Sequence, residues 1–337
     1  MNTYSPLLLT EAASRALENA GLIGEHSNLV ARVLIDADMR GHGSHGLMLL
    51  PLYLQRIREG GIIADATAEW LVESPPIAVV DAHGGPGQVA ANAAAERCAE
   101  LARGSAISAV AVRNNNHIGM LAAYRMAFQK RGIIGMILNI AGASVAAPGG
   151  SRATLGNNAF CLIAPTSRQE PFVIDFATGI VACGKIREAL MKGNQVPTEW
   201  LMDRTGAPST DPNDLDSGGA VPLFGGYKGL GLSIMIELLA GVVAGHTVSP
   251  MVNRQRAHLD RPMHCSQFFI GVNPSSFAVD SLEPFIEQLH DAVRSSYENQ
   301  PPSRVYFPDQ QEAFCHTLAE QNGLTITSEV RRLLDLP

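Results

Sequence analysis

The sequence has few charged residues and no concentration of positive charge. Charged residues make up 17% of the 337 positions, and 25 Lys and Arg stand against 32 Asp and Glu, a formal net charge of −7. Proteins that bind the phosphate backbone of nucleic acids need a positively charged face. The composition therefore argues against nucleic acid as a partner.

Cysteines are also few, and their spacing does not suit a shared site. The five are Cys98, Cys161, Cys183, Cys265 and Cys315. An odd number of widely separated cysteines without a CxxC pair is neither a disulfide framework nor the ligand set of a zinc site. We expect buried thiols in a reducing compartment and no bound metal.

Long apolar runs are missing as well. The longest extends over 230–243, is shorter than a membrane span and contains Glu237. The first residues have neither the positive charge nor the apolar core of a secretory signal. We expect a soluble, cytoplasmic protein with no membrane partner.

The residues that are present predict two joined domains, because the chain exceeds the roughly 250–300 residues at which a single core stops growing. Apolar residues at helical spacing predict two helices within 10–40, the first capped by Thr10, and a third over Leu47–Arg58. We expect a helical domain over 1–72, joined by a C-terminal helix over 310–337.

Strand–helix alternation begins near residue 75 and predicts an α/β domain over 75–305. The expected strands lie over 77–80, 107–112, 133–140, 160–164, 172–176 and 268–272. The expected helices lie over 90–103, 117–131, 180–191, 230–244 and 282–297. Residues 205–226 are rich in Gly, Pro, Asp and Ser, which favours a functional or linking loop over regular structure.

A glycine-rich bend between two expected helices contains Ser44 and His45. Glycines free the backbone there, so the imidazole can point into a cleft, and histidine suits general acid–base catalysis near neutral pH. From spacing alone, a surface histidine without a role is the more common outcome. His42 lies three residues earlier, but no nearby cysteine or carboxylate completes a metal site.

Three asparagines and His117 lie between an expected strand and an expected helix. Catalytic groups of α/β proteins gather at the carboxyl ends of strands, and the positive pole of a helix start would keep a nearby histidine neutral. Asparagines that only form a turn and a cap are an equally good interpretation.

Only four lysines occur in the chain, and two have apolar, glycine-flanked surroundings. Lys228 lies within Gly225–Gly231 at the start of an expected helix, a suitable place to meet phosphate or carboxylate. Lys185 has a similar setting. For each, a lysine whose stem packs at the edge of a buried element is an equal alternative.

Gly85, Gly87 and Ala90 match the G-x-G-x-x-A pattern of a Rossmann dinucleotide site. Such a site also needs an acidic residue about 20 positions later for the ribose hydroxyl, and here that strand ends at Arg113. Arginine could accompany a 2′-phosphate, but Pro86 within the turn weakens the match. We do not expect a Rossmann site.

Seven ordered segments together resemble one family along nearly the whole chain. They are Ala37–Gly46, Asn116–Gly119, Asn139 with Pro148–Gly150, Leu155–Asn158, Ile174–Thr178, Gly184–Ile186 and Lys228–Gly231. In this order they resemble the type-2 malate/L-lactate dehydrogenase family of NAD(P)-dependent oxidoreductases.

The resemblance implies an enzyme that uses NAD or NADP to interconvert a small 2-hydroxy acid and its 2-oxo acid. It implies a mixed-sheet, non-Rossmann nicotinamide-binding α/β domain beside an N-terminal helical domain, as in sulfolactate dehydrogenase. It also implies a homodimer.

By position, Ser44 and His45 match the active-site pair of the family, and His117 matches a histidine of acid–base or cofactor-binding role. The resemblance implies cofactor contacts from His117, Ile118, Gly119, Met120, Leu121, Asp175, Phe176, Ala177, Tyr227, Lys228 and Pro308. We expect His45 to move the hydroxyl proton with Ser44 orienting it, and we keep His117 as the rival.

The chain departs from the family at substrate-binding positions. Many relatives carry an arginine where Leu49 stands, which would clamp the substrate carboxylate. Either Arg152 or Arg187 replaces it, or the substrate is apolar near Leu49. A family threonine that contacts substrate is Asn157 here.

Two further departures bear on the alternatives. Reduction of a cyclic ketimine or diketo acid is the alternative within the family. Lys185 stands where some ketimine reductases have an aspartate, which argues against the ketimine branch. A Pro-Gly turn that touches cofactor in relatives is Pro308-Asp309 here, and an inward carboxylate would disfavour NADP. An alternative of another class is a non-catalytic or metal-binding protein that uses His42, His45 and His117.

Overall fold

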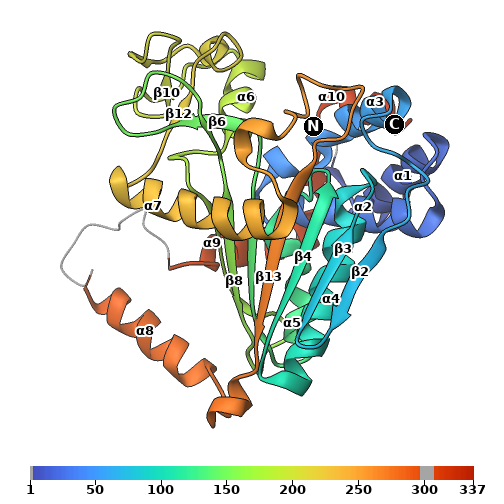
Figure 1. Cartoon of the computed structure of the whole chain (residues 1–337). Coiled ribbons are helices and arrows are strands. Elements are labelled where there is room, and N and C mark those ends of the chain that lie inside the picture. The colour runs from blue at the N-terminus through green and yellow to red at the C-terminus, as the bar shows by residue number, and fades with distance from the viewer. Residues whose placement is uncertain (1–2, 297–306) are drawn as a thin grey trace.

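The computed structural model describes residues 3–296 and 307–337, and its centre is a seven-stranded sheet (Figure 1). The strand order is β2-β3-β4-β13-β5-β8-β9, with β3 and β4 parallel and every other neighbouring pair antiparallel. The bounds are Glu69–Ser74 (β2), Ile77–Asp81 (β3), Ile107–Asn115 (β4), Ile134–Asn139 (β5), Ala159–Ala164 (β8), Phe172–Ala177 (β9) and Cys265–Val272 (β13). The predicted mixed sheet is confirmed, and β2 is an additional edge strand.

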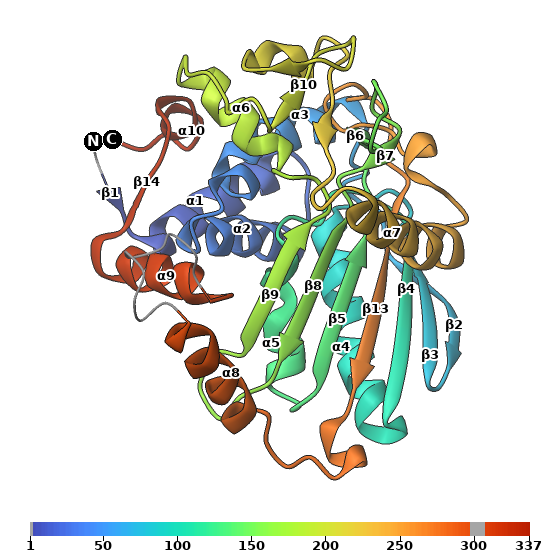
Figure 2. The ribbon, with the colours of Figure 1, turned by 90° about the vertical axis from the view of Figure 1, so that its left-hand side faces the viewer.

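Adjacent residues of the central strand β13 point to opposite faces of the sheet, as side chains alternate along a strand. Phe269 is fully buried in the cluster formed with α4 (Gly87–Ser105) and α5 (Arg125–Gln129). Phe268 packs on the other face, where α7 (Tyr227–Ile236) and its π-helical continuation (Glu237–Val243) cross one end of the sheet (Figure 2). The expected helix over 230–244 is therefore present but begins earlier.

The N-terminal helices and the C-terminal tail share one buried cluster. Its helices are α1 (Pro6–Asn19), α2 (Gly24–Met39), α3 (Leu50–Glu59) and α10 (Ser328–Leu333). The tail also includes α9 (Gln310–Asn322), which packs against α2, and β14 (Leu324–Thr325), which pairs with β1 (Thr3–Tyr4). This pairing brings the two chain ends together (Figure 2). The tail therefore packs on the first helices.

Two helix predictions were wrong in their details. The first helix is capped by Ser5, not Thr10, because Pro6 suits the first helical position and the helix runs through Thr10. The segment predicted as a helix over 117–131 has no regular secondary structure up to Met120. It then forms a 3-10 turn over Leu121–Tyr124 and the short helix α5. Gly119 has φ +76°, which a regular helix does not allow.

A small lobe lies above the sheet and has its own buried cluster, which includes Val145, Ile186, Leu201 and Val221. Its elements are β6 (Ala143–Ala146), β7 (Leu155–Gly156), α6 (Cys183–Met191), β10 (Leu201–Met202), β11 (Pro208–Ser209), the 3-10 turn Pro212–Leu215 and β12 (Val221–Pro222). The prediction of a loop over 205–226 was therefore wrong in part, because its few apolar side chains pack into this lobe.

The glycine turn before α4 is covered by the chain itself. A Cβ atom on Gly87 would lie 2.4 Å from the carbonyl oxygen of His117 and 2.6 Å from that of Asn116. The backbone there leaves no space for a pyrophosphate, so the expectation that this turn is not a Rossmann site is supported.

Other elements are α8 (Glu283–Ser295) and the 3-10 turns Ser249–Met251 and Pro274–Phe277. The predicted end of the 282–297 helix, Tyr297, and the predicted domain boundary at 305 lie outside the described residues. Within the described part of the chain, every helix is too short or too polar to cross a membrane.

Candidate active site

A tight turn after α2 positions Ser44 and His45. The chain forms two 3-10 turns there, Gly43–His45 and Leu47–Leu49. The buried carboxylate of Asp38 accepts a hydrogen bond from the backbone N–H of Leu47 (2.8 Å), and burial raises the pKa of Asp38 to about 7. A Cβ atom on Gly46 would lie 2.0 Å from Asp38 Oδ1, so this turn requires glycine at position 46.

The Ser44 hydroxyl and the His45 imidazole are hydrogen-bonded. Ser44 Oγ lies 3.0 Å from His45 Nδ1. The turn packs against the start of α6, where a Cβ atom on Gly184 would lie 2.4 Å from Ser44 Cβ. Burial lowers the pKa of His45 to about 4, with smaller contributions from His42 and Lys185. His45 is therefore a neutral imidazole at pH 7 with a hydroxyl partner.

His117 follows β4 and is held through its Nδ1 atom. Tyr53 Oη lies 2.6 Å from Nδ1, and the backbone N–H of Gly119 donates to the same nitrogen (3.3 Å). Gln88 donates to Tyr53 Oη (3.0 Å), so the tyrosine directs its own proton to His117. With donors at Nδ1, the proton of a neutral His117 is on Nε2.

Burial lowers the pKa of His117 to about 3, and His45 and nearby arginines add to the effect. His117 is therefore also neutral at pH 7, as its position between strand and helix had suggested. The proposed cause was wrong, since no helix begins at His117. Removal from water, not the pole of a helix, disfavours the charged imidazolium.

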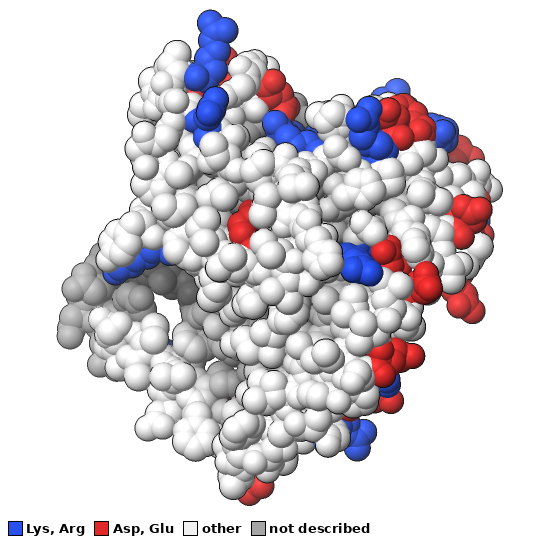
Figure 3. All heavy atoms as spheres, viewed as in Figure 1, with Lys and Arg blue, Asp and Glu red and all other residues white. Residues whose placement is uncertain are grey.

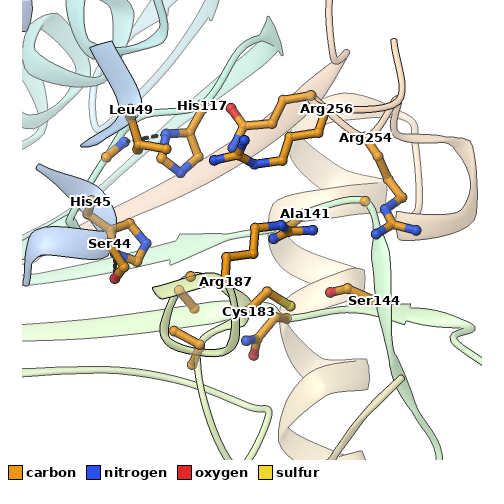
Figure 4. Close-up of a pocket in the computed structure, with 18 of the residues that line it drawn as sticks. Ser44, His45, Leu49, His117, Ala141, Ser144, Cys183, Arg187, Arg254 and Arg256 are labelled. Atoms are coloured by element: carbon orange, nitrogen blue, oxygen red, sulfur yellow. Dashed lines mark hydrogen bonds between the residues drawn. The ribbon is translucent and has the colours of Figure 1, made fainter. Parts of the chain in front are cut away.

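Both imidazoles line one cavity of about 500 Å³ (Figure 4). Three arginines extend into this cavity from other elements: Arg187 from α6, and Arg254 and Arg256 from the segment before β13. Asp216 also lines it and pairs with Arg187 (2.9 Å) and Arg254 (3.8 Å). In the described part of the chain, no carboxylate lies within ion-pair distance of Arg256.

The arginines therefore exceed the carboxylates in this cavity by two. Arg187 was one of two sequence candidates for the missing clamp, whereas Arg254 and Arg256 were not found from the sequence. Their spacing, Asn253-Arg254-Gln255-Arg256, is not distinctive, because Arg56 and Arg58 have the same spacing elsewhere in the chain. A cavity with surplus guanidinium groups suits an anionic ligand.

The other predicted substrate contacts differ in their surroundings. Leu49 lines the cavity and is almost fully buried. Asn157 also lines it, but its side chain is already used: Oδ1 accepts from Gly179 N–H (2.7 Å) and Nδ2 donates to the Val181 carbonyl (3.0 Å). Arg152 is exposed and lies outside the cavity, so the structure does not bring it to the site.

A second cavity of about 340 Å³ lies beside the first. Asp175 lines it and accepts a hydrogen bond from the backbone N–H of Ala122 (2.8 Å), while burial raises its pKa to about 6. Phe176, Met120 and Pro308 also line it.

Two short segments separate the cavities and contribute to both. Within 117–122 and 175–177, His117, Gly119, Leu121 and Ala177 line the first cavity, and Met120, Ala122, Asp175 and Phe176 line the second. Ile118 is buried and lines neither. An extended ligand with two ends can therefore contact these segments while it occupies both cavities.

Tyr227 and Lys228 line neither cavity. Both are exposed in the first turn of α7. The loop before them is held against β9, since Phe224 donates its backbone N–H to Thr178 (3.0 Å) and its ring contacts Phe176 (5.9 Å between centroids). Their predicted cofactor contact stays a prediction.

The three histidines of the metal-binding alternative do not converge. His42 lines the second cavity and lies 3.4 Å from Glu312, whereas His45 and His117 face the first. Across residues 3–296 and 307–337, no three His, Cys, Asp or Glu side chains are grouped to hold a metal ion.

Comparisons with known proteins place the chain in one family. The family model of malate/L-lactate dehydrogenase matches residues 5–335. The chain is 32% identical to malate dehydrogenase of Pyrococcus abyssi over 330 residues, covering 96% of this chain and 87% of the relative. It is 37% identical to (2R)-3-sulfolactate dehydrogenase (NADP(+)) of Chromohalobacter salexigens over 235 residues, covering 69% and 70%.

The fold agrees with these sequence relationships. The crystal structure of a dehydrogenase from Sinorhizobium meliloti is similar to this chain with a TM-score of 0.88, 30% sequence identity, and coverage of 99% of this chain and 97% of that one. Because the family model spans nearly the whole sequence, the chain belongs to the malate/L-lactate dehydrogenase family.

Proposed function

We propose that this protein is an NAD(P)-dependent oxidoreductase that interconverts a small 2-hydroxy acid and the corresponding 2-oxo acid. One observation carries the proposal: two neutral imidazoles face surplus arginines across a single cavity. A hydroxy acid presents a hydroxyl to the first group and a carboxylate to the second. Relatives named as NAD(+)- and NADP(+)-dependent dehydrogenases support the cofactor class.

The two adjoining cavities fit a dinucleotide, because the segments 117–122 and 175–177 face both. A bound nicotinamide supplies a hydride acceptor in oxidation and a hydride donor in reduction. The backbone of 117–121, the Asp175 carboxylate and Pro308 would hold the cofactor. Asp175 accepts a hydrogen bond from Ala122 N–H, and a carboxylate has further lone pairs that can accept one from a hydroxyl of the ligand.

The hydrogen bonds of the two histidines favour different roles, proton transfer for His45 and hydrogen-bond donation for His117. His45 is neutral, and the Ser44 hydroxyl can accept a hydrogen bond from its Nδ1–H, which leaves Nε2 to take the substrate hydroxyl proton in oxidation and return it in reduction. His117 has its Nδ1 occupied by Tyr53 and Gly119, which leaves Nε2–H as a donor to the same oxygen. This supports the choice of His45 over His117 as the acid–base group.

The arginines of the cavity would bind the substrate carboxylate, which Leu49 cannot do. Arg187 is held by Asp216, whereas Arg256 has no carboxylate partner in the described residues, so a substrate anion can pair with it. Two surplus positive charges favour a substrate with a second anionic group. Reduction of a cyclic ketimine or diketo acid stays the alternative within the family.

A direct test combines binding and turnover. The protein is titrated with NADH and NADPH while fluorescence is followed, and then assayed with a panel of 2-oxo acids and cyclic imines. We expect cofactor binding that EDTA does not alter and turnover of at least one dianionic 2-oxo acid. Turnover of cyclic imines alone would favour the alternative, and absence of binding to both cofactors would refute the proposal.

We also propose that the protein is a homodimer. Helix α8 has no buried residue, and Phe285, Leu289 and Val293 are exposed along it. The exposed side of α7 and its continuation is also apolar; it carries Tyr227, Ile234, Met235, Leu238, Val242 and Val243. Figure 3 shows few charged side chains on this face. A second copy would remove these surfaces from water.

Light scattering distinguishes the oligomeric states. We expect twice the mass of one chain for the wild type and a smaller mass for Leu238→Asp, which puts a charge in the apolar face. A wild-type monomer would contradict the dimer.

Two further assignments stay proposals. We place the protein in the cytoplasm, since its five cysteines are all unpaired thiols. We also divide the chain into a helical domain over 1–72 with 310–337 and an α/β domain over 75–305, because one buried cluster joins the first three helices to α10.

A further inference from the structure

The second cavity contains more carboxylates than positive groups that are free to bind a ligand. Asp175, Asp309 and Glu312 line it, together with Arg40 and His42. His42 is occupied by Glu312, 3.4 Å away. The cavity therefore presents an acidic wall to whatever enters it.

Arg40 does not compensate for this acidity. Its guanidinium is buried and already pairs with Glu170 (2.6 Å), Asp36 (3.4 Å) and Asp309 (3.6 Å). Arg125 shares two of these carboxylates, Asp36 (2.7 Å) and Glu170 (2.5 Å), so the cluster holds three carboxylates against two arginines and has little attraction left for an incoming phosphate. A phosphate group in this cavity would have to displace an existing ion pair.

Asp309 is the carboxylate of this cavity on which the inference depends. It follows Pro308 directly before α9, and its side chain points inward, with 18% of its surface exposed. Its backbone has φ +69°, a left-handed conformation that favours glycine. Aspartate is among the few residues other than glycine that adopt this conformation readily, so the backbone alone does not select it. Burial raises its pKa to about 6, so it is ionised at pH 8.

We propose that the acidic wall of the second cavity, with Asp309 as its main determinant, makes this protein select NADH over NADPH. The inference rests on the proposed function, because it concerns the cofactor of that reaction. Carboxylates accept hydrogen bonds from the ribose hydroxyls of NADH. In NADPH a phosphate replaces the 2′-hydroxyl of one ribose. The carboxylates of Asp309 and Asp175 then lose a hydrogen-bond donor and repel the added negative charge.

The test compares dissociation constants, not turnover. NADH and NADPH are each titrated into wild type and Asp309→Asn at pH 8 while protein fluorescence is followed. We expect the wild type to bind NADH at least about tenfold more tightly than NADPH. Asp309→Asn keeps the shape of the side chain and should reduce this ratio about fivefold or more, chiefly through tighter NADPH binding.

Two further variants complete the experiment. Asp309→Gly removes the same carboxylate and suits the left-handed backbone, so it replaces the asparagine variant if that one does not fold. Glu100→Gln removes an exposed charge on α4, and we expect it to leave the ratio unchanged.

The outcomes separate this inference from the proposed function. Equal binding of the two cofactors by the wild type, tighter NADPH binding, or an unchanged ratio in both Asp309 variants would overturn the selectivity while the oxidoreductase proposal stands. No binding of either cofactor would refute the proposed function and this inference together.

Discussion

The imidazole rings of His45 and His117 are stacked, with centroids 5.8 Å apart and planes inclined by 19°. One follows α2 and the other follows β4, so only the packing of the N-terminal helices on the sheet brings them together. A positive charge on one ring disfavours a charge on the other. The pair can therefore supply one proton acceptor and one neutral donor to the same substrate oxygen.

Replacing His45 should abolish most turnover. We expect His45→Ala to lower kcat by about 10²–10⁴-fold, because the substrate hydroxyl proton then lacks a positioned acceptor. The dissociation constant of the cofactor, measured by fluorescence titration, should change little. Unchanged turnover would instead make His117 the leading acid–base group.

Removing the hydroxyl of Tyr53 should impair catalysis through His117. Tyr53→Phe keeps the ring but deletes the donor at His117 Nδ1, so the Nε2–H tautomer loses support. We expect kcat to fall about 10–100-fold with a smaller change in KM.

Tyr124→Phe is the matched control for this variant. It deletes another buried hydroxyl, one that donates to the Ile118 carbonyl and not to an imidazole. Equal losses of kcat in the two variants would indicate a purely structural role for Tyr53.

The pH dependence should differ between the two directions of the reaction. The pKa of His45 is lowered to about 4, so its neutral, proton-accepting form persists down to that pH. We expect kcat/KM for oxidation to stay level over roughly pH 5–8. Reduction uses the protonated form, whose share rises about tenfold per unit of falling pH.

Initial rates in both directions over this range measure the two profiles. A midpoint near the ordinary histidine pKa in the oxidation profile would contradict the assignment of His45 as a base with a lowered pKa.

Removing Arg256, which has no carboxylate partner among the described residues, should separate dianionic from monoanionic substrates. We expect Arg256→Gln to raise KM for a dianionic 2-oxo acid about tenfold and for a monoanionic one by less than about threefold. Arg152→Gln is the matched control, because Arg152 is exposed and outside the cavity. Equal effects of the two variants would show that Arg256 does not meet the substrate.

Much of the site could be predicted because its segments are short and local. The glycines around Ser44 and His45 mark a turn. The turn allows no side chain at position 46, because the carboxylate of Asp38, only eight residues earlier, occupies that space. Six of the seven strands of the central sheet, all but β2, and the second and third helices likewise follow from apolar spacing within single segments. Errors arose where distant contacts decide, as at Gly119, which packs against Val33 of α2.

The sequence alone determined that the chain is a mixed α/β protein with a glycine-framed serine–histidine pair, since such signals depend on neighbouring residues. Tertiary structure decided which histidine is held by Tyr53, which arginines line the cavity beside Leu49, and where the Asp309 carboxylate points. Those properties depend on burial and on distances between residues far apart in the chain, and spacing along a sequence carries no measure of either.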